Sequence, residues 1–249
     1  MKKIVILPVY NEKKTVFEVL NEVQGYADII IIIDDSSTDG SREIIKKWAK
    51  NKSDIYPVFF EKNKGMAGAL RIGFLIVNQM LNENKITPDD IIINMDSDGQ
   101  HKAVYIKEIS DELTKNRFDM VTGRRNLKKH FFYKRFGNFV LTFTASVLSG
   151  RRFNDIECGF RAMRADVVPA LLEYYKGKNY SCASEIGIII SHLGYKISND
   201  YLIDIPFYRM RGARTWDGFV NLMCGIFVKF RLLSGMKTAV LFVDLSKYK

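Results

Sequence analysis

Residues 29–40 read IIIIIDDSSTDG, a run of five isoleucines that passes directly into a polar segment with three aspartates. A continuous β-branched run is typical of a strand buried on both faces of a sheet, and the polar residues after it are typical of a turn. Residues 41–49 then repeat apolar side chains at helical spacing. This stretch predicts a buried strand, a polar turn and a helix, in that order.

The same order of strand and helix recurs on both sides of this stretch. Strands are predicted at residues 3–9, 29–33, 55–60, 90–95 and 118–122, and helices at residues 13–23, 41–49, 66–81 and 104–113. This alternation predicts an α/β fold with a doubly wound, mostly parallel sheet and helices on both faces. Because no segment looks like a linker, we expect residues 1–249 to form a single domain.

Polar residues follow three of the predicted strands. They are Pro8-Val9-Tyr10-Asn11-Glu12, Asp34-Asp35-Ser36-Ser37-Thr38-Asp39-Gly40 and Asp96-Ser97-Asp98-Gly99-Gln100-His101. Ligands of doubly wound sheets bind beyond the carboxyl ends of the strands, so we expect these clusters to converge on one binding edge. The first cluster stands where a glycine-rich dinucleotide motif would follow the first strand, which argues against a dehydrogenase.

Asp96 and Asp98 suggest a metal site, because converging carboxylates repel one another and lose hydration. Hard ions such as Mg²⁺ or Mn²⁺ prefer oxygen ligands, and Mg²⁺ is commonly held by one or two carboxylates together with substrate phosphates. Alternatively, Asp96 caps a turn and Asp98 caps the next helix. An EF-hand fits less well, because a buried strand precedes the pair and the later glutamate is missing.

The net charge of +10 is unevenly distributed along the chain. Residues 120–154 contain no acidic residue, but they contain Arg124, Arg125, Lys128, Lys129, Lys134, Arg135, Arg151 and Arg152. This indicates an anionic partner, which is nucleic acid, lipid headgroups or a phosphorylated substrate, or else a solvated basic loop. Nucleic acid fits least, because the acidic strand ends would repel a polyanion.

The three cysteines, Cys158, Cys182 and Cys224, lack the spacing of a disulfide framework or a zinc knuckle, which favours a reducing cytoplasm. Asn11 and Glu12 end the first apolar run too early for a signal peptide. The most apolar late stretch, residues 219–230, is shorter than the roughly 20 residues that span a bilayer. We therefore expect a protein that is soluble or lies on a membrane surface.

Four motifs in this order resemble family 2 of the inverting glycosyltransferases, which have the GT-A fold. They are Pro8-Val9-Tyr10-Asn11-Glu12, Asp34-Asp35-Ser36-Ser37-Thr38-Asp39-Gly40, Asn63-Lys64-Gly65 and Asp96-Ser97-Asp98. Two later motifs are similar to the branch of dolichyl phosphate mannose synthase and polyprenyl phosphate glucosyltransferase, whose acceptor is a lipid phosphate. They are Thr122-Gly123-Arg124-Arg125 and Asp155-Ile156-Glu157-Cys158-Gly159-Phe160-Arg161-Ala162. The usual Asp-Ala-Asp is Asp-Ser-Asp here, which keeps both carboxylates.

The resemblance implies roles for these residues. The residues that it assigns to the nucleoside diphosphate sugar are Pro8, Tyr10, Asn11, Glu12, Asp35, Ser37, Lys64, Gly65, Asp96 and Ser97. Asp96, Asp98 and Gln100 are assigned to Mg²⁺ or Mn²⁺, and Asp98 is also counted as catalytic. The implied donor is a GDP- or UDP-hexose, and the ion stabilises the charge that builds on the leaving diphosphate.

The acceptor determines which further groups are needed. A hydroxyl acceptor requires a general base, for which Asp155 is the candidate by family analogy. A lipid phosphate is already anionic and needs cations instead, and we expect Arg124 and Arg135 to hold it.

Two further segments each allow two interpretations. Aromatic residues interleave the cations after residue 130, as in an interfacial helix or in an ordinary core. They are Phe131, Phe132, Tyr133 and Phe136. Arg209, Arg211 and Arg214, beside Gly212, form either a loop that closes over the diphosphate or a solvated loop.

The expected function is therefore inverting, metal-dependent transfer of a hexose to a dolichyl or undecaprenyl phosphate, by a protein on the cytoplasmic face of a membrane. Residues 1–123 are expected to form the nucleotide-sugar half, residues 124–215 the acceptor half, and residues 216–249 a region of amphipathic interfacial helices. Some members of the branch have C-terminal membrane helices. We expect none here, so the lipid acceptor would be bound at the membrane surface. One alternative is a family 2 transferase that uses a saccharide or lipid-linked saccharide hydroxyl. The other is a nucleotide-sugar-binding regulator without turnover.

Overall fold

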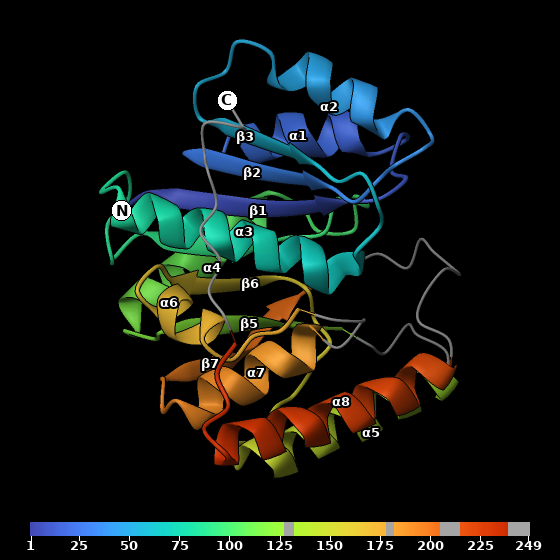
Figure 1. Ribbon diagram of the computed structural model, residues 1–249, viewed down its shortest axis with the longest axis vertical. Helices are drawn as coiled ribbons and strands as arrows, with labels where there is room; N and C mark the ends of the chain where they lie inside the picture. The colour runs from blue at the N-terminus through green and yellow to red at the C-terminus, as the bar shows by residue number, and fades with distance from the viewer. Residues whose placement is uncertain (127–131, 178–181, 205–214, 239–249) are drawn as a thin grey trace.

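The computed structural model describes residues 1–126, 132–177, 182–204 and 215–238 (Figure 1). The strands are β1 (Lys3–Val9), β2 (Ile29–Asp34), β3 (Ile55–Phe59), β4 (Ile91–Asn94), β5 (Met120–Arg125), β6 (Arg161–Arg164) and β7 (Ile197–Ile203). The helices are α1 (Val16–Gln24), α2 (Ser41–Ala49), α3 (Gly65–Asn82), α4 (Val104–Lys115), α5 (Phe132–Ser149), α6 (Val167–Leu172), α7 (Cys182–His192) and α8 (Thr215–Leu233).

The strands form one seven-stranded sheet in the order β3-β2-β1-β4-β6-β5-β7. β1 pairs in parallel with both β2 and β4, so the order of the strands reverses between β1 and β4. β6 runs antiparallel to its neighbours β4 and β5, and β7 pairs in parallel with β5. The sheet is therefore mostly parallel and doubly wound, as predicted, and the carboxyl ends of β1, β2 and β4 lie together at its switch point.

The isoleucine run in β2 supplies both faces of the sheet. Ile31 and Ile33 belong to the core cluster under α3, α6 and α7. Ile30 and Ile32 belong to the cluster under α1, α2 and α4. Successive side chains of a strand point to opposite faces, so only a continuously apolar strand can fill both cores. The predicted helices on both faces are thereby confirmed.

Helices α5, α7 and α8 form a separate packed group at the β7 end of the sheet (Figure 1). α7 contributes to the core of the sheet, and α5 and α8 lie side by side on its outer side, from where Ala145, Val228 and Leu232 join the same core cluster. Within the described ranges, none of the helices is both long and apolar enough to cross a bilayer. α8 is nevertheless longer than the apolar stretch at residues 219–230 suggested.

Two strands were not predicted, and four of the five predicted strands differ from the structure by one to three residues at one or both ends. The prediction ended the series of strands at residue 122, but β5 continues to Arg125, and β6 separates it from β4. β6 reads Arg-Ala-Met-Arg and contains no β-branched residue. β7 completes the sheet from a part of the chain for which no strand was predicted.

Candidate active site

The three polar clusters meet at the carboxyl ends of β1, β2 and β4, as expected. The backbone N–H of Asn11 donates to Oγ of Ser37 at 3.0 Å, and the N–H of Thr38 donates to Oδ1 of Asn11 at 2.8 Å. Oγ of Ser97 donates to the carbonyl oxygen of Pro8 at 2.7 Å, inside the protein. The loops after β1, β2 and β4 are therefore joined to one another through Pro8, Asn11, Ser37, Thr38 and Ser97.

Asn11 adopts a left-handed backbone with φ of 55°, a conformation that asparagine tolerates better than most residues. The adjacent Tyr10 is half exposed, and its ring is available as a flat surface at the edge of the site. Glu12 is partly buried, and Oγ1 of Thr15 donates to its carboxylate at 3.3 Å. The same hydroxyl reaches the carbonyl oxygen of Ser97 at 3.1 Å, which connects the loops after β1 and β4.

Asp35 is buried at the end of β2 and holds the start of α3. Its Oδ1 accepts a hydrogen bond from the N–H of Lys64 at 2.6 Å, and its Oδ2 accepts one from the N–H of Gly65 at 2.8 Å. Burial raises the pKa of Asp35, and these two hydrogen bonds oppose the rise. Each carboxylate oxygen has a further lone pair, so Asp35 can also accept a hydrogen bond from a ligand.

The neighbouring Asp34 has a structural partner that the sequence analysis did not identify. Asp34 is fully buried, and Nε of Arg42 in α2 donates to its Oδ2 at 2.7 Å. Arg42 also donates to the carbonyl oxygen of Phe60 and so ties α2 to the end of β3. Asp34 thus holds α2 on the sheet through its ion pair, whereas the buried Asp35 lies beside Lys64, whose side chain is exposed.

Asp96 and Asp98 lie in the loop after β4 and form a pair of like charges. Both side chains are partly buried, and the N–H of Gln100 donates to Oδ1 of Asp98 at 3.0 Å. Burial raises the pKa of Asp98, and the negative charge of Asp96 raises it further. Such a pair is stabilised by a cation.

These residues fit a hard divalent ion in one particular way. In the part of the chain that the structure describes, no three His, Cys, Asp or Glu side chains are arranged to hold a metal. Asp96 and Asp98 supply two carboxylates, a number compatible with the sites in which Mg²⁺ is held by one or two carboxylates together with substrate phosphates.

Two residues that the sequence analysis did not select lie close to Asp96. Gly159, just before β6, lies so close that a Cβ at this position would be 2.8 Å from Oδ2 of Asp96. His101 is buried, its ring packs against Phe160 at 5.3 Å, and its Nδ1 is 3.8 Å from Oδ2 of Asp96. Nδ1 has no hydrogen-bond partner among the described residues. The signal for His101 was its place in the third polar cluster, but its burial is visible only in the fold.

Asp155, the candidate base, is buried in an ion pair with Arg125. Nε of Arg125 donates to Oδ2 of Asp155 at 2.7 Å, and an NH2 group of the same guanidinium donates to Oδ1 at 2.8 Å. Burial acts to raise the pKa of Asp155, but the hydrogen bonds and charge of Arg125 outweigh it and hold that pKa below its usual value. Arg125 also donates to Oδ1 of Asn138 at 3.1 Å, which links the end of β5 to α5.

Glu157 is a second carboxylate in the same segment. Oγ of Ser184 in α7 donates to its Oε1 at 2.9 Å. Burial raises the pKa of Glu157, and the hydrogen bond from Ser184 and the charges of Arg125 and Arg161 oppose the rise. With a raised pKa, the carboxylate of Glu157 is the stronger base of the two, because the pKa of Asp155 is lowered.

The two arginines expected to hold the acceptor lie on different elements. Arg124 is the penultimate residue of β5, and its side chain is 43% exposed and approaches Asp200 only to 4.0 Å. Arg135 is exposed on α5, where it lines an open groove of about 770 Å³. The remaining lining residues are Phe132, Phe136, Asn138, Phe139, Thr142, Phe143, Ser146, Arg152, Phe153 and Asn154. Arg124 is not part of this lining.

Several candidates cannot be placed. Arg211, with Arg209 and Arg214, lies outside the described residues, as do Lys128, Lys129 and Phe131.

Comparison with known proteins shows the family. Residues 4–172 match the family described as Glycosyl transferase family 2. An uncharacterised protein of Methanocaldococcus jannaschii is 30% identical over 206 residues, which cover 80% of this chain and 86% of that protein. A UDP-N-acetylglucosamine–dolichyl-phosphate N-acetylglucosaminyltransferase of Methanococcus voltae is 27% identical, and the match covers 92% of this chain and 93% of that protein.

Two further comparisons concern the branch and the fold. An undecaprenyl-phosphate 4-deoxy-4-formamido-L-arabinose transferase of Shewanella sediminis is 26% identical over 95% of this chain and 67% of that protein. Glucosyl-3-phosphoglycerate synthase from Mycobacterium tuberculosis, solved with Mn²⁺, UDP and phosphoglyceric acid, has a TM-score of 0.65 at 15% identity, over 98% of this chain and 88% of that one. This likeness confirms the expected GT-A-type fold. The chain belongs to glycosyl transferase family 2 and is a glycosyltransferase.

Proposed function

We propose that this glycosyltransferase moves a hexose, with inversion, from a UDP- or GDP-sugar to a polyprenyl phosphate. The observation that carries the choice of acceptor is the ion pair of Asp155 with Arg125, in which both carboxylate oxygens accept hydrogen bonds from the guanidinium. A carboxylate in this state is a poor general base, and a phosphate acceptor needs none because it is already anionic. The relatives named as acting on dolichyl and undecaprenyl phosphates support the same choice.

The strand-end clusters support the donor side of the proposal. Tyr10, Glu12 and Asp35 surround the ends of β1 and β2, where a doubly wound sheet binds a nucleotide. Asp96 and Asp98 would hold Mg²⁺ or Mn²⁺ against the diphosphate, and the ion would supply stabilisation of the leaving charge. The complex of the Mycobacterium tuberculosis synthase with Mn²⁺ and UDP supports such a pairing of ion and nucleotide in this fold.

The acceptor side rests on the cations at the end of β5 and on α5. Arg124 and Arg135 are exposed, and within the described part of the chain neither forms an ion pair shorter than 4.0 Å. Their guanidinium groups match phosphate oxygens in geometry as well as in charge. We infer that they orient the phosphate of the acceptor toward the anomeric carbon.

Partitioning of a labelled sugar tests the proposal. The full chain is incubated with Mg²⁺ or Mn²⁺, a panel of radiolabelled UDP- and GDP-hexoses, and a short-chain polyprenyl phosphate. Label that enters butanol only when the polyprenyl phosphate is present supports the proposal. Label in a water-soluble saccharide means a hydroxyl acceptor, and donor binding without transfer means a regulator.

The alternative of a hydroxyl acceptor has its own candidate base in Glu157, because burial raises its pKa. Glu157→Gln separates the two reactions, since this substitution removes a proton acceptor but keeps a side chain that can bond to Ser184. For a phosphate acceptor we expect the transfer rate to change less than threefold. A loss of a hundredfold or more would favour the hydroxyl acceptor, because general base catalysis contributes about 10²–10⁴-fold.

A further inference from the structure

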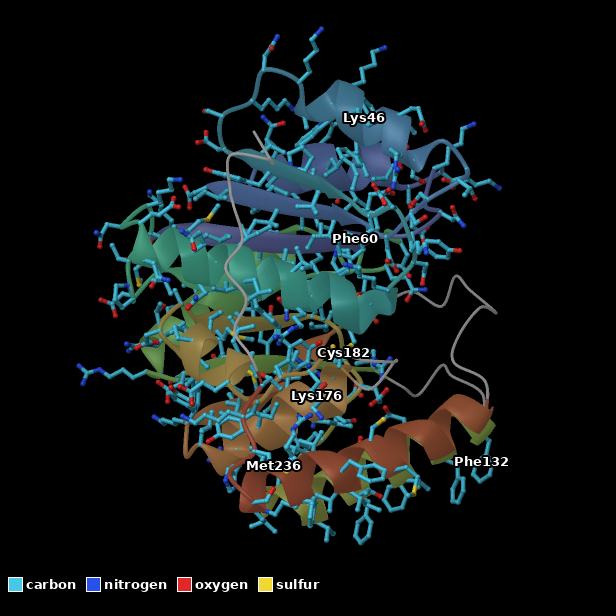
Figure 2. The ribbon with its side chains drawn as sticks, in the orientation of Figure 1. Lys46, Phe60, Phe132, Lys176, Cys182 and Met236 are labelled. Atoms are coloured by element: carbon cyan, nitrogen blue, oxygen red, sulfur yellow. The ribbon has the colours of Figure 1, made fainter. Side chains whose placement is uncertain are left out.

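Helices α5 and α8 each expose a continuous apolar stripe. On α5 the stripe follows helical spacing and consists of Phe132, Phe136, Phe139, Phe143 and Val147. On α8 it consists of Met223, Ile226, Phe227, Phe230 and Leu233. Figure 2 shows Phe132 at one end of this helix pair, pointing away from the body of the molecule, and Met236 near the other end.

These stripes are not the core faces of the two helices. α5 turns Thr142 and Ala145 inward, and α8 turns Val228 and Leu232 inward, where all four are buried. Each helix is therefore apolar on two sides, whereas a helix that faces water normally carries polar residues opposite its core face. We call the ten exposed side chains of the two stripes the docking face.

The size of the docking face exceeds what a free surface usually carries. Each of its six phenylalanines is at least 59% exposed. With roughly 150 Å² for each aromatic side chain, they alone expose about 600 Å². The largest apolar patch of a typical monomer covers about 300–600 Å², and four aliphatic side chains add to this one. Exposed apolar surface of this extent marks an interaction site.

The charges around the docking face indicate the kind of partner. Neither α5 nor residues 223–233 of α8 contain an acidic residue. Arg135 and Arg152 are exposed and line the groove beside the phenylalanines, and Lys229 is partly exposed on α8. A second copy of the chain, paired through the same face, would place these cationic groups opposite one another, which is unfavourable. A surface with negative charges above an apolar layer can bind the phenylalanines through its apolar layer and the arginines through its negative charges.

We infer that the docking face binds a lipid bilayer that carries anionic headgroups, with α5 and α8 lying in the plane of the interface. The phenylalanines enter the boundary between headgroups and acyl chains, and Arg135 and Arg152 remain at the level of the lipid phosphates. The hydrogen bond from Arg125 to Asn138 ties the docking face to the ion pair with Asp155. The inference deepens the proposed function, because it identifies the surface through which the chain meets its lipid acceptor, but it does not depend on the transfer reaction.

Vesicle flotation with purified full-length protein tests the inference without any sugar donor. Phosphatidylcholine vesicles are compared with vesicles that contain one quarter phosphatidylglycerol. The test variants are Phe139→Ser on α5 and Phe227→Ser on α8, which are 63% and 65% exposed, so neither substitution removes a core contact. Phe17→Ser on α1, where Phe17 is 53% exposed, is the matched control.

The expected result is stronger binding to the vesicles with phosphatidylglycerol, reduced about tenfold by either test variant and unchanged in Phe17→Ser. Arg152→Gln should weaken binding about fivefold, and only to the anionic vesicles. Circular dichroism and Mn²⁺-dependent nucleotide binding should remain those of the unchanged protein in all variants.

Two results would overturn the inference. One is equal flotation of the unchanged protein and the two test variants, or no flotation at all. The other is a dimer in analytical ultracentrifugation without lipid that Phe139→Ser and Phe227→Ser dissociate, which would identify a second copy as the occupant. Because no transfer is measured, neither result bears on the proposed reaction.

Discussion

Gly159→Ala tests whether the position of Asp96 controls the metal site. A Cβ on residue 159 would lie 2.8 Å from Oδ2 of Asp96, whereas ordinary contact begins at 3.4 Å, so the carboxylate must move by the difference of 0.6 Å. Catalytic constellations tolerate displacements of about 0.5 Å, and a misplacement of 1 Å can cost about a hundredfold in rate. We expect the affinity for Mn²⁺ in the presence of nucleotide, and kcat/KM for transfer, to fall about tenfold or more.

The fold should survive this substitution. The Asp96 side chain is 33% exposed and can move toward solvent, so the cost in unfolding free energy should be about 1 kcal/mol, at the low end for an overpacked site. Gly137→Ala on α5 is the control, because nothing lies within 4 Å of the added methyl group. It should leave Mn²⁺ binding unchanged.

Calorimetric titration with Mn²⁺ and UDP or GDP measures the affinity, and thermal unfolding measures the stability. The reasoning would be refuted if Gly159→Ala bound Mn²⁺ and transferred sugar within twofold of the unchanged protein. Asp96 would then not need its observed position.

Substitutions at four further residues test the other parts of the site. Asp98→Asn should abolish transfer and, without metal, raise the unfolding free energy at pH 7. Burial raises the pKa of Asp98 above 3.8. The contribution of Asp98 to stability is therefore present below pH 3.8 and is lost as the pH rises through the raised pKa. Urea titrations at acidic and neutral pH check this, and equal stability at pH 7 would contradict it. Asp155→Asn should lower the unfolding free energy by about 3 kcal/mol, because it leaves Arg125 without its counter-charge. Since Arg125 lowers the pKa of Asp155, this stabilisation is present above pH 3.8 and disappears as the pH falls through the lowered pKa. Loss of activity with unchanged stability would instead make Asp155 a catalytic base. Asp35→Asn should weaken nucleotide binding and destabilise the start of α3 by about 1 kcal/mol, and normal nucleotide affinity in calorimetry would remove Asp35 from the site. Arg135→Ala should raise the acceptor KM about tenfold to a hundredfold with little change in the donor KM, while Arg135→Lys should show a smaller effect; equal shifts in both KM values would argue against an acceptor role.

The part of the fold that was predictable from sequence is the part with regular apolar patterns. β1 is rich in β-branched residues, β2 contains a run of five isoleucines, and α2 begins and ends where its helical spacing predicts. β6 has no such apolar pattern. Its four residues form a strand through pairing with β4 on one side and β5 on the other. A strand whose place is set by two distant partners has no local signal to read.

The candidate site divides in the same way. The convergence of the three polar clusters follows from strand direction alone and was predicted. The partners of individual carboxylates were not, because Asp34 and Asp155 each select one arginine among the 38 basic residues of the chain through tertiary contact. The close approach of Gly159 to Asp96 is likewise a property of the segment that enters β6.

The insertion of β6 between β4 and β5 has a consequence for synthesis on the ribosome. When the chain has emerged only as far as residue 126, β5 exists but the strand that joins it to β4 has not yet been made. The emerging chain can pair β1 with β2 and β4, and β2 with β3, but the other edge of β4 stays open until residues 161–164 arrive. An open edge of this kind pairs readily with other chains. The edge of β4 is therefore protected from aggregation only after β6 has been synthesised. A shortened fragment that ends after β5 should be recovered mainly in inclusion bodies.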